Sequence, residues 1–145
     1  MVAHTIVETL IDLATIESDA AAKRLGNALR TSEESQEKKE LLENYRQEYI
    51  KQLQTTMATG LSIQKHKNYQ NFIHGLDRAI NQQAQICLSD QDKVQEHRKI
   101  WQYSEKTRLS YTALSNRAIS FAKKNNDKQE QRNTDEFACR KNIMK

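Results

Sequence analysis

The sequence predicts an all-α fold, and within that class a long antiparallel two-helix coiled coil, that is, a helical hairpin. The 145 residues include no proline and only three glycines, too few for the corners of a β-sandwich or the glycine-rich loop of a nucleotide-binding fold. Only 37% of the residues are hydrophobic and 29% are charged, which leaves little to fill a compact core. Apolar residues recur at spacings of three and four, which is typical of helices with one packed face.

The first helix is expected to span residues 5–57. Its opening apolar residues are spaced by four, three and three and share one helical face: Ile6, Leu10, Leu13 and Ile16. Residues 31–40 are almost wholly polar and predict a solvated stretch. The apolar face then resumes at Leu41, Leu42, Tyr45, Tyr49, Ile50, Leu53 and Met57.

A turn is expected at residues 58–62. Gly60 is well placed to end a helix in the left-handed conformation, and Ser62 is a favourable N-cap for the helix that follows. Because this connection is short, it predicts that the two helices run antiparallel.

The second helix is expected to span residues 63–140. Its apolar stripe has spacings of three, four and seven, as in a coiled-coil seam. The predicted stripe comprises Tyr69, Ile73, Leu76, Ile80, Ala84, Cys87, Val94, Trp101, Leu114, Ala118 and Phe121. The whole chain, residues 1–145, is therefore predicted to be a single coiled-coil hairpin.

Charge and register both support pairing of the helices. Residues 1–60 carry seven basic and ten acidic side chains, a net charge of −3, whereas residues 61–145 carry 16 basic and nine acidic, a net charge of +7. Folding about the turn pairs residues whose numbers add up to about 121. Large residues then meet at matched distances from the turn: Leu42 with Ala79, Tyr45 with Leu76 and Tyr49 with Phe72.

The same register leaves the C-terminal part of the second helix unpaired. Residue 5 would lie opposite residue 116, so about 25 polar, basic residues beyond it have no partner in the chain. Such a helix is marginal in water and is expected either to fray or to dock against another molecule. Cys87 and Cys139 would lie about 78 Å apart on one continuous helix, which excludes a disulfide between them.

Catalytic, metal-binding and cofactor-binding residues are not indicated. His66 and His74 are two helical turns apart, about 12 Å, and cannot chelate one ion. No nucleophile and base stand at a catalytic spacing, and no cofactor is predicted. The chain has neither a membrane-spanning stretch nor a secretory signal, so we expect it in the cytoplasm.

The aromatic group Tyr45, Tyr49 and Phe72, with Leu76, allows two interpretations. These residues could form the seam of the hairpin. Alternatively, Ile50, Leu53, Met57, Ile73 and Ile80 form the seam, and the aromatic group lies beside it as an exposed strip that a partner binds. Two further classes of function stay open: a self-contained homodimerising coiled-coil scaffold, and a basic nucleic-acid-binding helical protein.

Several short motifs, in order and along the whole chain, resemble those of the FliJ family, a coiled-coil component of the flagellar type III export apparatus. The resemblance rests on His4, Glu8-Thr9-Leu10, Asp12-Leu13-Ala14, Tyr45, Glu48-Tyr49, Asn68-Tyr69-Gln70-Asn71-Phe72-Ile73, Leu76, Ala79-Ile80 and Asp135-Glu136-Phe137-Ala138. It implies a hairpin similar to the stalk of the γ subunit of rotary ATP synthases.

The resemblance also implies partners and sites. The terminal ends would enter the ring of the hexameric export ATPase FliI and promote its assembly through Leu10, Leu13, Asp135, Glu136 and Phe137. A strip near the turn would bind the export-gate protein FlhA through Leu42, Tyr45, Tyr49, Phe72, Leu76 and Ala79. The family also escorts export chaperones. The implied location is the cytoplasmic face of the inner membrane at the flagellar base, with no insertion into the membrane and no nucleic-acid partner.

Overall fold

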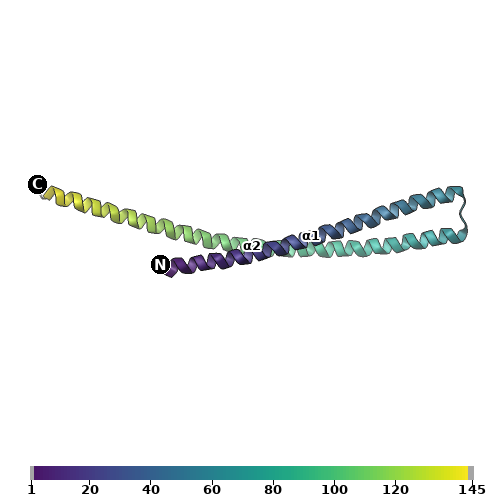
Figure 1. The fold of residues 1–145 in the computed structure, drawn as a ribbon, viewed down its shortest axis with the longest axis horizontal. Coiled ribbons are helices and arrows are strands. Elements are labelled where there is room, and N and C mark those ends of the chain that lie inside the picture. The colour runs from purple at the N-terminus through teal and green to yellow at the C-terminus, as the bar shows by residue number, and fades with distance from the viewer. Residues whose placement is uncertain (1, 144–145) are drawn as a thin grey trace. The chain divides into compact units, whose positions relative to one another are not determined.

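Two long helices make up nearly all of the computed structural model, which describes residues 2–143. Helix α1 (Val2–Thr59) has 58 residues and helix α2 (Ile63–Ile143) has 81, and the described residues form no strand (Figure 1). The all-α fold and the helical hairpin are therefore confirmed. No stretch within the described helices is apolar and long enough to span a bilayer.

The turn is built as the sequence predicts. Gly60 has a positive φ of 96°, and its N–H donates to the carbonyl of Met57 at 3.3 Å, which satisfies one of the orphan carbonyls of α1. The hydroxyl oxygen of Ser62 accepts a hydrogen bond from the N–H of Lys65 at 3.3 Å, the geometry of an N-cap. Helix α1 continues to Thr59, two residues past its predicted end, so the turn comprises residues 60–62.

The packing contacts divide the chain into two compact units. One unit comprises the N-terminal residues up to Ala20 and the residues from Gln102 on, and residues Ala21–Trp101 form the other unit. We call these the terminal unit and the turn unit. In each unit, a segment of α1 packs against a segment of α2.

The core of the turn unit follows a heptad repeat. On α2, one row of buried or half-buried residues recurs at alternating spacings of three and four: Tyr69, Ile73, Leu76, Ile80, Gln83, Cys87, Asp90, Val94, His97 and Trp101. This is the 3.5-residue period of a coiled coil. The seam is rich in small and polar residues, since Ala21, Ser35 and Asp90 are among the buried positions. The thin core explains how so polar a sequence can fold.

The predicted seam of the N-terminal segment is wrong. Ile6, Leu10, Leu13 and Ile16 are 36–65% exposed. The positions that pack instead are each displaced by one or two residues: Val7, Ile11, Ala14 and Ser18. The reason is the phase: Val7 to Ser18 continue the row of packed positions that runs on along α1 through Ala21 and Leu25 at spacings of three and four, whereas Ile6, Leu10 and Leu13 lie one residue out of phase with it. The packed register then buries the small residues Ala14 and Ser18 between the helices.

Several other residues expected in the seam are exposed. On α1 these are Leu41, Tyr45 and Met57, and on α2 they are Leu114, Ala118 and Phe121. Ala118 and Phe121 lie where α1 comes to its end and offers nothing for them to pack against. Leu114 is exposed although its neighbours Thr112 and Ser115 are half-buried, so it lies off the packed face of α2. Every described residue of α2 from 116 to 143 is exposed, which agrees with the unpaired C-terminal segment that the sequence predicts.

Candidate functional site

Aromatic side chains from both helices meet near the turn. The rings of Tyr49 and Phe72 stack with their centroids 4.2 Å apart and their planes 29° apart. Tyr45 stacks on Tyr49 at 6.3 Å, and Tyr69 is tilted against Tyr49 at 5.4 Å. The contact between Tyr49 and Phe72 is one that the predicted register requires, so the pairing of these two residues is confirmed.

Burial separates this group into a packed part and an exposed part. Leu76 is only 9% exposed and belongs to the core, whereas Phe72 is 41% exposed and Tyr45 is 51% exposed. The other three residues of the predicted gate strip, Leu42, Tyr49 and Ala79, are half-buried. Each of the two open interpretations therefore holds for some of the residues: Leu76 is a seam residue, and Phe72 with Tyr45 forms an exposed edge on that seam.

A cavity of about 360 Å³ adjoins the exposed edge. It is lined by Tyr49, Tyr69 and Phe72, together with Lys65 and Asn68. Lys65, Asn68 and Tyr69 were not among the predicted site residues. They lie seven, four and three residues before Phe72, which places them on the same helical face, so the spacing could have revealed them.

Polar contacts fix the register of the turn unit. The Arg46 guanidinium pairs with the Asp77 carboxylate, and the Ser35 hydroxyl donates to the Asp90 carboxylate. The side-chain amide of Gln83 donates to the carbonyl of Ser35 at 3.0 Å. Each contact joins α1 to α2. Because Ser35 and Asp90 are buried, a shift of register would leave their polar groups without a hydrogen-bond partner. Hydrophobic periodicity does not reveal these contacts, because it marks only apolar residues.

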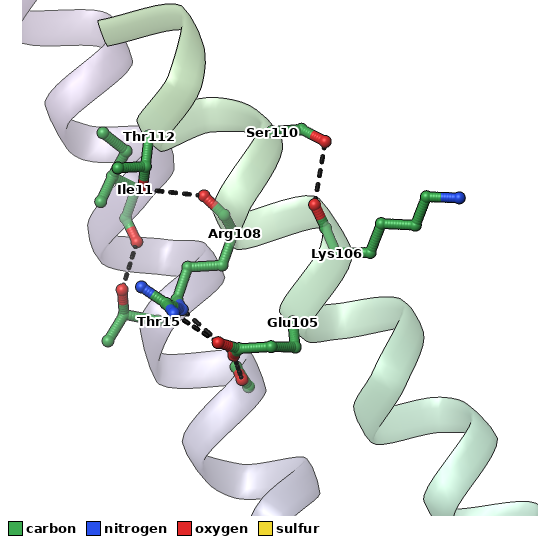
Figure 2. A network of polar contacts seen from close by, with 8 residues as sticks. Ile11, Thr15, Glu105, Lys106, Arg108, Ser110 and Thr112 are labelled. Atoms are coloured by element: carbon green, nitrogen blue, oxygen red, sulfur yellow. Dashed lines mark hydrogen bonds and ion pairs between the residues drawn. The ribbon is translucent and has the colours of Figure 1, made fainter. Parts of the chain in front are cut away.

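A second polar network lies in the terminal unit (Figure 2). The hydroxyl of Ser18 donates to Oε2 of Glu105 at 2.7 Å, and Nε of Arg108 donates to the same oxygen at 3.1 Å. Hydrogen bonds from Arg108 and then from Ser18 lower the pKa of Glu105 from 4.5 to about 2. The hydrogen bond with Glu105 likewise raises the pKa of Arg108. The network ties α1 to α2 through a carboxylate that stays ionised.

The residues predicted to bind an ATPase ring are exposed, but they do not form one cluster. Leu10 is 36% exposed, Leu13 58% and Phe137 69%, and Asp135 and Glu136 are exposed as well. Asp135 accepts a hydrogen bond from Gln131 on its own helix at 3.3 Å. In the observed register Leu10 lies opposite residue 113 or so, and Phe137 is more than 20 residues, about 35 Å, farther along α2. The two sets are thus separate surfaces of the terminal unit.

The described part of the chain contains no group of side chains arranged as a metal site. No group of three or more His, Cys, Asp or Glu side chains is placed to hold a metal ion among the described residues. Both cysteines are free thiols; Cys87 is buried and Cys139 is exposed.

Comparison with known proteins identifies the family. The family described as "Flagellar FliJ protein" matches residues 7–145. The flagellar FliJ protein of Salmonella typhi is 32% identical over 145 residues, covering 100% of this chain and 99% of its own length. That of Escherichia coli (strain K12) is 30% identical with the same coverage, and that of Buchnera aphidicola is 33% identical over 61 residues, or 42% of each chain. With the family match and these relatives extending along both helices, the chain belongs to the flagellar FliJ family.

Proposed function

We propose that this chain is a non-enzymatic component of the flagellar type III protein export apparatus. It works at the cytoplasmic face of the inner membrane, at the base of the flagellum. Its terminal unit binds the ring of the export ATPase FliI and promotes ring assembly, and its turn unit binds the export gate FlhA. It also escorts export chaperones. Family membership supports the flagellar role, and the relatives are named for the flagellum rather than for a reaction.

The observation that carries the gate-binding part is the exposed aromatic edge. Phe72 and Tyr45 remain 41% and 51% exposed although Tyr49, which both of them contact, is half-buried. Large aromatic side chains that are held in place by stacking and still face solvent are typical of binding hot spots. The adjoining cavity of about 360 Å³ offers room for an apolar side chain of the partner.

The observation that supports ring binding is the bare segment 116–143 of α2. Its described side chains are all exposed, including Ile119, Phe121, Phe137 and Ile143 at 54–83%. An isolated helix with these apolar residues gains little stability in water, because most helical stability comes from packing. A protein surface that covers them would therefore stabilise the segment.

Two truncations test both bindings. Removing residues 137–145, or residues 1–13, is expected to abolish most of the stimulation of FliI ATP hydrolysis while FlhA binding persists. The reason is that the truncated residues belong to the terminal unit, whereas the aromatic edge belongs to the turn unit. The measurements are phosphate release by FliI and co-purification with the cytoplasmic domain of FlhA. Loss of FlhA binding with intact stimulation would show that the assignment of the two ends is reversed.

A further inference from the structure

One flank of α2 in the turn unit presents apolar residues to solvent at a seven-residue period. The positions directly before the core residues 73, 80, 87, 94 and 101 are Phe72, Ala79, Ile86, Lys93 and Ile100. Phe72, Ile86 and Ile100 are 41–43% exposed. The corresponding row on the other flank, residues 70, 77, 84, 91 and 98, contains two glutamines, an aspartate, an alanine and an arginine. Of these two rows, therefore, only the first carries exposed large apolar side chains; Leu88, which is 62% exposed, belongs to neither row.

A cavity of about 300 Å³ opens on this same flank, around Lys93. Helix α1 contributes Arg24, Asn27, Ala28 and Thr31, and α2 contributes Asp90, Lys93 and His97. Both helices line it, so it lies in the groove between them. Lys93 is flanked along the row by Ile86 and Ile100, each seven residues or about 10 Å away. A polar cavity therefore sits between two apolar contact points.

The cavity is basic and its polar groups have unused hydrogen-bonding capacity. Asp90 is its one acidic residue, and the carboxylate already accepts a hydrogen bond from Ser35. Among the described residues, Arg24 and Lys93 take part in none of the ion pairs, which join Lys39 to Glu43, Arg46 to Asp77 and Arg108 to Glu105. Nδ1 of His97 is buried without a hydrogen-bond partner. Such a set of donors is suited to an anionic group.

We propose that this flank binds an amphipathic helix of a partner protein that inserts an acidic side chain between Arg24 and Lys93. Apolar residues of that helix, one heptad before and after the acid, pack on Ile86 and Ile100. The basic cavity favours a carboxylate by charge complementarity. The two isoleucines lie two heptads apart, a spacing that matches one face of a helix. A nucleic acid fits less well, because exposed isoleucines offer its phosphates nothing. Phe72 is 21 residues, about 32 Å, from Lys93 along α2, so this surface does not depend on the proposed gate contact.

Two synthetic helical peptides of three heptads serve as probes. Both carry leucines at the positions meant for Ile86 and Ile100; one has a central pair of glutamates and the other a central pair of lysines. Fluorescence anisotropy of the labelled peptides measures binding to the full chain. We expect the glutamate peptide to bind at least about tenfold more tightly than the lysine peptide, because the lysines would face like charges in the cavity. Equal affinity of the two peptides would overturn the proposal.

Charge reversal in the chain sharpens the test. The double variant Arg24→Glu/Lys93→Glu should reverse the preference between the two peptides. Lys23→Glu/Arg98→Glu is the matched control, since it makes the same change of charge at exposed neighbours that do not line the cavity, and it should retain the preference. Circular dichroism establishes that each variant is helical. If the cavity variant does not fold, the relative affinity of the unaltered chain for the glutamate and lysine peptides still tests the proposal.

Two other occupants would also overturn the proposal. A single-stranded oligonucleotide that binds more tightly than the glutamate peptide, and is lost with the cavity variant alone, would identify a nucleic-acid site. Sedimentation showing a dimer of the unaltered chain that only the cavity variant dissociates would identify a second copy of the chain as the occupant.

Discussion

From residue 63 to residue 101, α2 has a buried or half-buried side chain at every third or fourth position, whereas from residue 116 to residue 143 it has none. Both stretches belong to one continuous helix. The difference is the presence of α1, which packs on the first stretch within the turn unit. Burial of α2 therefore follows the presence of a partner helix, and the bare stretch is where a partner surface remains to be supplied.

The largest expected effect contrasts a packed leucine with an exposed one. Leu76→Ala should lower the free energy of unfolding by about 2–5 kcal/mol, because Leu76 is 9% exposed and leaves a cavity in the core. Leu114→Ala is the matched control in the terminal unit; Leu114 is 52% exposed, and the change should stay within about 0.5 kcal/mol. Thermal melting followed by circular dichroism checks both. Equal losses would mean that burial does not distinguish Leu76 from Leu114 as described.

A smaller effect is expected one turn away, at the exposed aromatic edge. Phe72→Ala should weaken binding of the cytoplasmic domain of FlhA by about 2 kcal/mol or more. Its cost in stability should be limited to the aromatic contact with Tyr49, about 0.5–1.5 kcal/mol. A pull-down and a melting curve on the same preparation make the measurement. Lost helicity together with lost binding would assign Phe72 to the core and leave the gate site without a location.

Next in size is the polar seam of the turn unit. Ser35→Ala removes the hydrogen bond to the buried carboxylate of Asp90 and should cost about 1–3 kcal/mol. Ser110→Ala in the terminal unit is the control, because the exposed Ser110 hydroxyl bonds only to a carbonyl of its own helix. Urea unfolding gives both values. If the two variants unfold at the same urea concentration, the pairing of Ser35 with Asp90 contributes nothing to the fold.

The smallest expected effect is a pH dependence in the terminal unit. The pKa of Glu105 is about 2 in the folded chain, below its ordinary value of 4.5, so the unfolded chain takes up this proton more readily. The stabilisation is complete above pH 4.5 and is lost as the pH falls from there to about 2. Melting temperatures over this range should fall more steeply for the unaltered chain than for Glu105→Gln. Parallel curves for the two proteins would contradict the shift.

The sequence predicts the turn unit better than it predicts the terminal unit. Gly60, Ser62 and the pairing of Tyr49 with Phe72 follow from local chemistry and from counting outward from the turn. The N-terminal seam does not follow, because Ile6, Leu10, Leu13 and Ile16 form a convincing stripe that is out of phase with the packed positions of α1. The contacts of Ser18 with Glu105 and of Ser35 with Asp90 were also missed. Polar seam residues carry no hydrophobic signal, and their pairing depends on a register that only the folded helices reveal.

The two cysteines differ in exposure, so thiol labelling of the unaltered chain can follow both its opening and its coverage by a partner. The thiol of Cys139 is exposed on the bare segment of α2, whereas that of Cys87 is buried in the turn unit. A thiol reagent should therefore modify Cys139 at once and reach Cys87 only when the surrounding helices separate. The slow phase of labelling would measure how often the turn unit opens. A dye on Cys139 alone would report when the bare segment becomes covered by a partner, with no residue of the chain replaced.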